Sequence, residues 1–121
     1  MIVNLTQHPC SKEQEEQGVF NLPASEKEAL SRALTFLTLP SREEVLQRAQ
    51  AVADIAAASG ADSAMIGGAM YLMGPLEGAL HARGIVPLYA FSQRKSVEVT
   101  DPSTGEVKKT AVFFHLGFVE A

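Results

Sequence analysis

Three polar or glycine-rich segments of the sequence each follow an apolar run that is typical of a β-strand. The segments are Asn4-Leu5-Thr6-Gln7-His8, Gly67-Gly68-Ala69-Met70-Tyr71 and Ser92-Gln93-Arg94. In an open α/β sheet, ligands bind beyond the carboxyl ends of the parallel strands, where the strand order reverses. We therefore predict that these three segments share one rim and form a binding site there, with Asn4 contributing from the end of the first strand.

The first segment offers three kinds of hydrogen-bonding group in a single loop. Thr6, Gln7 and His8 supply a hydroxyl, an amide and an imidazole. Such a set can bind a base or a phosphate, and His8 can act as a general acid or base. The alternative is that Thr6 and Gln7 only cap the short helix that follows Pro9.

The Gly67-Gly68 pair precedes a predicted helix. Two glycines allow the backbone to approach a bound group, and the start of a helix offers free N–H donors to an anion. The spacing of a dinucleotide-binding G-x-G-x-x-G is absent, as is the phosphate-binding motif of P-loop NTPases. The alternative is a simple strand-to-helix turn.

Arg94 is the only cation in the three segments, and with Ser92 it completes the predicted ligand set. A guanidinium can hold a phosphate by two parallel hydrogen bonds. The alternative is a surface salt bridge. His8 and Arg94 are the candidate catalytic residues.

We predict no metal site and no cofactor, because His8 and Cys10 have no further ligand nearer than His115.

Apolar runs and helix caps predict the secondary structure. Short strands are expected at Ile2 to Leu5, Val19 to Leu22, Ser63 to Ile66 and Val86 to Phe91. The sequence SVEVT-DPSTG-EVKKTAVFFHLGFV predicts a hairpin after them.

Three capping boxes, in which a serine is followed three residues later by Gln or Glu, mark the starts of three of the four predicted helices. The pairs are Ser11 with Gln14, Ser25 with Glu28 and Ser41 with Glu44. Helices are expected over KEQEEQ, from Ser25 to Thr35, from Ser41 to Ser59 and from Leu72 to Arg83, with Pro75 in the first turn of the last.

The resulting element order, β-α-β-α-α-β-α-β-β-β, predicts an α/β fold. We expect a small, Rossmann-like, three-layer domain over residues 1–121. Its central sheet should be mostly parallel, with right-handed crossovers and a C-terminal antiparallel hairpin at one edge.

Composition narrows the class of protein. The net charge is −4 and the sequence lacks a basic stripe, which argues against binding to duplex nucleic acid. The chain has no apolar run of about 20 residues and no signal-peptide pattern, so we expect a cytoplasmic protein that does not enter a membrane. The single cysteine allows no intrachain disulfide.

Four stretches resemble a family of small uncharacterised bacterial proteins that are borne by prophages or plasmids. They are NLTQHPCSKEQ, MIGGAMYLMGPLEGALHARGI, PLYAFSQRKS and FHLGFV. The opening N-L-T-Q-H-P followed by E-Q is also similar to the CRISPR-accessory proteins Csx fifteen and Csx twenty. These are proposed Rossmann-like relatives of the CARF domains that sense or cleave cyclic oligoadenylate.

The second resemblance implies a cyclic nucleotide bound across a dimer two-fold axis. Its matching ligand positions are Asn4, Thr6, Gln7, His8, Gly67, Gly68, Ser92 and Arg94. Such a ligand can be cleaved without a metal, because its own 2′-hydroxyl attacks the neighbouring phosphate.

Two functions of different classes therefore remain open. The first is a binding module for a nucleotide or cyclic oligoadenylate, or a metal-independent ring nuclease that acts on such a ligand. The second is a non-enzymatic homodimeric interaction protein of mobile-element origin that uses the hairpin at Lys95 to Val112, with the run Val112-Phe113-Phe114 and Phe118 as its seam. A third hypothesis is that the protein is an enzyme that acts on a different small metabolite.

Overall fold

A computed structural model describes residues 1–121 as five strands and four helices. The strands are β1 (Ile2–Asn4), β2 (Val19–Phe20), β3 (Ser63–Met65), β4 (Val86–Thr100) and β5 (Val107–Glu120). The helices are α1 (Lys12–Glu16), α2 (Ala24–Leu34), α3 (Arg42–Ala58) and α4 (Met70–Ala82). The predicted order of elements is confirmed, except that the last three predicted strands are two.

All five strands form one sheet in the order β2-β1-β3-β4-β5. The first four strands are parallel to their neighbours, and β5 pairs antiparallel to β4 at one edge. Within the sheet, β2 pairs with one edge of β1, and the chain then returns past β1 so that β3 pairs with its other edge. The strand order therefore reverses between β1 and β3. The predicted α/β class, with a mostly parallel sheet and a C-terminal antiparallel hairpin, is confirmed.

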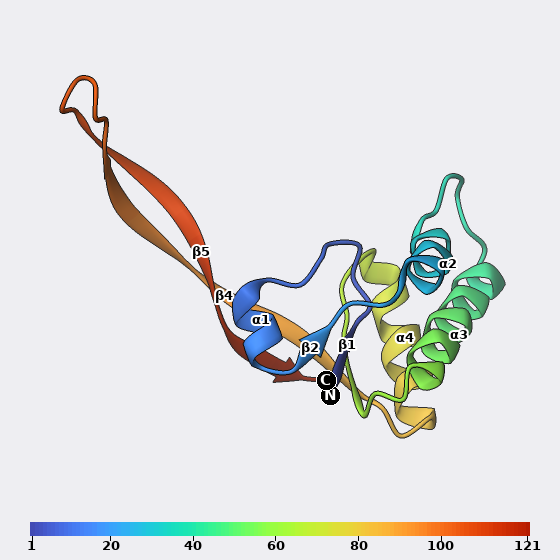
Figure 1. Cartoon of the computed structure of the whole chain (residues 1–121). Coiled ribbons are helices and arrows are strands. Elements are labelled where there is room, and N and C mark those ends of the chain that lie inside the picture. Colours follow the sequence, from blue (N-terminus) through green and yellow to red (C-terminus); the bar gives the residue numbers. More distant parts are fainter.

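Helices lie on both faces of the sheet (Figure 1). α2, α3 and α4 pack together on one face, and the short α1 lies on the other, beside β2 and β5. The core fills the space between the sheet and the three larger helices. Its largest fully buried side chains include Val3 and Leu5 from the first strand segment, and Leu72, Leu76 and Leu80 from α4. None of the helices has both the length and the apolar composition that a membrane span requires.

Two of the three predicted caps are confirmed. Ser11 and Gln14 form the full capping box of α1, and the Ser41 hydroxyl accepts a hydrogen bond from the backbone N–H of Glu44 (3.1 Å). The cap at Ser25 is wrong, because α2 begins at Ala24, directly after Pro23, and has no side-chain cap. Proline presets the backbone for helix entry. The Ser25 hydroxyl instead donates to Glu26 (2.6 Å).

The helix α4 begins at Met70, slightly before the start predicted near Leu72, and follows the turn at Gly68 (φ +144°). Pro75 consequently lies inside α4, past its first turn. Its ring removes the hydrogen bond to the carbonyl of Tyr71.

The end predicted for β4 is the main error. The strand continues through Ser92, Gln93 and Arg94 to Thr100, with a bulge between Phe91 and Ser92. Beyond the body of the sheet, β4 and β5 form a long two-stranded ribbon that projects away from the rest of the molecule (Figure 1). We call residues 92–115 the arm.

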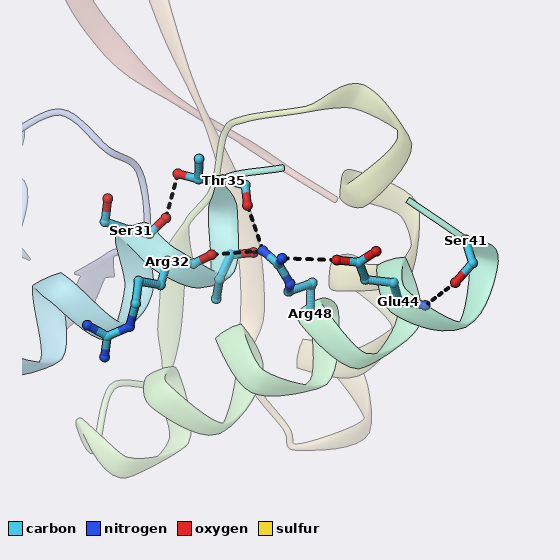
Figure 2. A network of polar contacts seen from close by, with 7 residues as sticks. Ser31, Arg32, Thr35, Ser41, Glu44 and Arg48 are labelled. Carbon is cyan, nitrogen blue, oxygen red and sulfur yellow. Dashed lines mark hydrogen bonds and ion pairs between the residues drawn. The ribbon is translucent and has the colours of Figure 1, made fainter. Parts of the chain in front are cut away.

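Arg48 of α3 joins the end of α2 to α3 (Figure 2). Its Nη1 atom donates to the carbonyls of Arg32 (2.8 Å), Ala33 (3.2 Å) and Thr35 (2.7 Å). Its Nη2 atom donates to Glu44 Oε1 (3.0 Å). One guanidinium thus satisfies carbonyls that the end of a helix leaves without intrahelical partners.

We predict that Arg48→Met lowers the free energy of unfolding by about 2–3 kcal/mol, because a charged donor to several carbonyls is lost. Arg32→Met is the control. Its ion pair with Glu28 is exposed, and such pairs contribute roughly 0.5 kcal/mol or less. Urea unfolding of the two variants measures the difference, and equal losses would contradict the role given to Arg48.

Candidate functional site

A groove of about 620 Å³ lies at the carboxyl ends of β1 and β3, where it also borders β4 at Ala90. This is the edge of the sheet at which the strand order reverses. Its wall comes from the loop after β1, the first residues of α1, the turn after β3 and one residue of β4. The lining residues are Thr6, Gln7, His8, Pro9, Ser11, Gln14, Met65, Ile66, Gly67, Gly68 and Ala90.

The buried side chain of Asn4 holds the loop after β1. Its Nδ2 donates to the carbonyl of His8 (2.7 Å) and to Asn21 Oδ1 (2.9 Å). Its Oδ1 accepts from the backbone N–H (2.9 Å) and the hydroxyl (2.7 Å) of Thr6. Asn4 is the only buried polar residue, 4% exposed, and its polar atoms are fully used inside the protein.

Asn21 ties the same loop to the chain beyond β2. Its Oδ1 accepts from Asn4 and also from the backbone N–H of Cys10 (3.1 Å). The loop from Thr6 to Cys10 is thus held at both ends by side-chain amides. Gln7 and His8, between these ends, are exposed at the groove.

The turn after β3 forms the opposite wall. A Cβ atom built on Gly67 would lie 3.5 Å from Thr6 Cγ2, so the two loops are separated by little more than a van der Waals contact. Gly68 adopts φ +144°, a backbone conformation that other residues rarely reach. No side chain caps the start of α4 at Ala69, so the first turn presents backbone N–H groups without a side-chain partner.

Five of the eight predicted ligand residues line the groove, namely Thr6, Gln7, His8, Gly67 and Gly68. Asn4 lies beneath the loop and positions it. Ser92 and Arg94 lie on the arm and not in the groove wall, because β4 does not end at Phe91. The expectation that Thr6, Gly68 and Arg94 share one rim is therefore met by the first two only.

Sequence reasoning missed several lining residues. Ser11 and Gln14 were recognised only as a helix cap, although that cap also faces the groove. Met65 and Ile66 were assigned to a strand and its core. Ala90 is brought to the groove by the parallel register that sets Met65 opposite Leu88, a pairing for which the sequence carries no local signal.

The groove carries no formal charge of its own apart from the titratable imidazole of His8. No Lys, Arg, Asp or Glu is among its lining residues. Two helix N-termini, each with a partial positive charge, adjoin the groove: that of α1, whose cap residues Ser11 and Gln14 line it, and that of α4, which follows the Gly67–Gly68 turn. No group of three or more His, Cys, Asp or Glu is placed to hold a metal ion.

Cys10 lies beside the groove wall and is half-buried. Burial raises the pKa of its thiol, and the carboxylate of Glu15, 3.8 Å from the sulfur, raises it further. A thiol nucleophile needs a lowered pKa. The surroundings of Cys10 therefore oppose a nucleophilic role.

Fold and site together define a class of protein: a small α/β domain, wound on both faces of its sheet, with a neutral polar groove at the reversal point. The chain belongs to the uncharacterized protein MJ1673 family, whose model matches residues 1–119. The predicted membership of a family of small uncharacterised proteins is confirmed at this level. No curated protein and no solved structure matches the chain.

We predict that Asn4→Ala lowers the free energy of unfolding by about 2 kcal/mol, because the backbone N–H of Thr6 and the carbonyl of His8 each lose a partly buried hydrogen bond. Asn21→Ala removes a single exposed acceptor and should cost about 1 kcal/mol. Urea unfolding gives both values. Amide hydrogen exchange at Thr6 should quicken in the first variant only, and unchanged exchange there would contradict the role of Asn4.

We also predict that Cys10 reacts slowly with iodoacetamide at neutral pH. The pKa of its thiol is raised, so the reactive thiolate appears only as the pH rises above the range of an ordinary cysteine. Glu15→Gln removes the adjacent charge and should move the pH midpoint of alkylation downward. Glu16→Gln, a neighbour without this contact, should leave it unchanged. A wild-type midpoint below that of free cysteine would refute the prediction.

Proposed function

We propose that the groove binds a nucleotide. The observation that carries this proposal is the meeting of the Thr6–His8 loop with the Gly67–Gly68 turn across a groove at the reversal point of the sheet. In open α/β sheets, this is the general position of ligand binding. The volume, about 620 Å³, lies within the range of small-molecule sites.

The Gly67–Gly68 wall suits a phosphate. The backbone is bare of side chains there, and the uncapped first turn of α4 directs N–H groups and a partial positive charge toward an anion. The absence of acidic residues from the lining means that no carboxylate repels the ligand.

The opposite wall suits a base and a sugar. Gln7 and His8 are exposed, and their side chains form no hydrogen bond within the protein, so both are free for a ligand. Met65, Ile66 and Ala90 supply apolar surface between the two polar walls. A small polar set on an apolar floor is typical of sites that orient a ligand.

Within the nucleotides, we propose cyclic oligoadenylate as the ligand. The similarity of the opening motif to Csx fifteen and Csx twenty supports this choice. Arg94 points from the same face of β4 as Ala90, since the two are an even number of residues apart. Four residues of strand set it about 13 Å from Ala90. A mononucleotide in the groove would not reach Arg94, but a phosphate of a larger ligand would.

A ring nuclease reaction fits the same site. The ligand's 2′-oxygen would bond to the adjacent phosphorus as the bond from phosphorus to the 5′-oxygen breaks. The products would be a 2′,3′-cyclic phosphate and a 5′-hydroxyl. His8 would take the proton from the 2′-hydroxyl or return one to the 5′-oxygen, and backbone N–H groups would stabilise the phosphate charge.

We predict that the wild-type protein gains thermal stability with adenosine monophosphate or with cyclic oligoadenylates of about two to six nucleotides. Gln7→Ala and His8→Ala should each weaken binding by about five- to tenfold, the value of one neutral hydrogen bond. Gln47→Ala, on the exposed side of α3, is the matched control. Failure of every nucleotide to bind at about 1 mM in calorimetry would overturn the proposal.

Arg94→Ala separates the two sizes of ligand. It should leave binding of the mononucleotide unchanged and weaken binding of a cyclic oligoadenylate by about tenfold or more, as for a charge-assisted hydrogen bond. Product analysis of the bound oligonucleotide tests cleavage. At a ligand concentration that saturates its weakened binding, His8→Ala should give no 2′,3′-cyclic phosphate, and an undiminished yield would remove His8 from the reaction.

A further inference from the structure

A second cavity lies between the loop that joins α2 to α3, the first two turns of α3 and the start of α4. We call it the cleft. Its volume is about 350 Å³, and it shares no lining residue with the groove. Its apolar lining residues are Leu39, Pro40, Val45, Leu46, Tyr71 and Pro75. Ser41 and Arg42 complete the lining, and a mostly apolar cavity with few polar groups is typical of small-molecule sites.

Apolar side chains around the cleft are left uncovered by the rest of the chain. Leu39 is 97% exposed, Tyr71 is 52% exposed and Leu46 is 40% exposed. Single exposed apolar side chains are normal on a protein surface, but here three of them border one cavity. Such a gathering marks a binding surface.

The wall of the cleft at Tyr71 is held in place by the chain itself. The Tyr71 ring meets Phe36 edge-on, with the ring centroids 5.2 Å apart. The guanidinium of Arg48 lies 4.7 Å from the centroid of Phe36, and the same side chain binds the carbonyl of Thr35 at the start of the loop (Figure 2). The loop and the Tyr71 ring are therefore positioned before a ligand arrives, which lowers the entropic cost of binding.

Arg42 supplies the only charge in the lining of the cleft. None of the ion pairs of the chain includes it. Its neighbours Glu43 and Glu44 are not lining residues, and Glu44 is paired with Arg48 (3.0 Å). A guanidinium without an ion-pair partner, beside an apolar cavity, is complementary to a carboxylate that is attached to an apolar body.

We propose that the cleft binds a small organic carboxylate. The aromatic or branched aliphatic body of the ligand packs against Leu46 and Tyr71, and its carboxylate accepts hydrogen bonds from Arg42. An apolar cation would meet the guanidinium as a like charge, and inorganic phosphate would leave the apolar lining in contact with water. The proposal is independent of nucleotide binding, because the cleft and the groove have no residue in common.

Isothermal titration calorimetry of the full chain tests the proposal with two probes of one shape. 3-Phenylpropanoate carries a carboxylate, and 3-phenylpropanamide has the same apolar body without the charge. The carboxylate should bind about tenfold or more tightly than the amide, as expected for a charged against a neutral hydrogen-bond partner. In NMR titrations with the carboxylate, the backbone amides of Leu46 and Tyr71 should shift, whereas those of Gln7 and His8 in the groove should not.

Two pairs of variants assign the binding to the cleft. Arg42→Gln should weaken binding of the carboxylate by about tenfold and leave binding of the amide unchanged. Arg32→Gln is its control, because Arg32 does not line the cleft. Leu46→Glu places a like charge in the wall and should weaken the carboxylate by about tenfold or more. Gln47→Glu adds the same charge at the next residue, outside the lining, and should change the affinity by about twofold or less.

Several outcomes would overturn the proposal. They are a carboxylate that fails to bind at about 5 mM, equal affinities for the two probes, and an Arg42→Gln variant that keeps the preference for the carboxylate. Equal losses in Leu46→Glu and Gln47→Glu would do the same. Far-ultraviolet circular dichroism checks that each variant is folded, and Arg42→Gln, at an exposed position, keeps the test decisive if Leu46→Glu unfolds. Nucleotide binding is measured separately, so its failure leaves this test intact.

Discussion

The candidate site depends on one buried amide. Asn4 lies at the end of β1, and its side chain both donates and accepts hydrogen bonds that set the course of the loop to His8. A buried polar group is stable only when its hydrogen bonds are made. The loop therefore has one course that satisfies Asn4, and this course exposes Gln7 and His8 at the groove. Asn4 lies beneath the loop, away from the groove, and it fixes the positions of Gln7 and His8, which face the groove.

The reversal of the strand order determines where the groove opens. The chain leaves β1 toward α1 on one face and leaves β3 toward α4 on the other, so no helix covers the gap between the two strand ends. No Lys, Arg, Asp or Glu lines the groove, and α4 begins directly after its Gly67–Gly68 wall.

Much of this arrangement could be predicted from the sequence, because local chemistry specified it. The caps at Ser11 and Ser41 and the glycine turn at Gly67 each depend on neighbouring residues. The end of β4 could not be predicted, because the polar run beginning at Ser92 resembles the loop that normally follows a buried strand. In a ribbon exposed on both faces, polarity no longer marks the end of a strand. The pairing of β4 with β3, which brings Ala90 to the groove, joins residues far apart in the sequence, so no local sequence pattern indicates it.

The arm is built outside the core, because no residue after Pro87 is buried. Its length can therefore change without disturbing the packed interior. Removing two residues from each strand would shorten the reach and keep every side chain on its original face, whereas removing one from each would exchange the faces of all residues beyond the cut. In related chains, insertions and deletions in the arm are therefore expected to add or remove an even number of residues, and the same number in each strand. The ribbon would then vary in length while its side chains stay on the same faces.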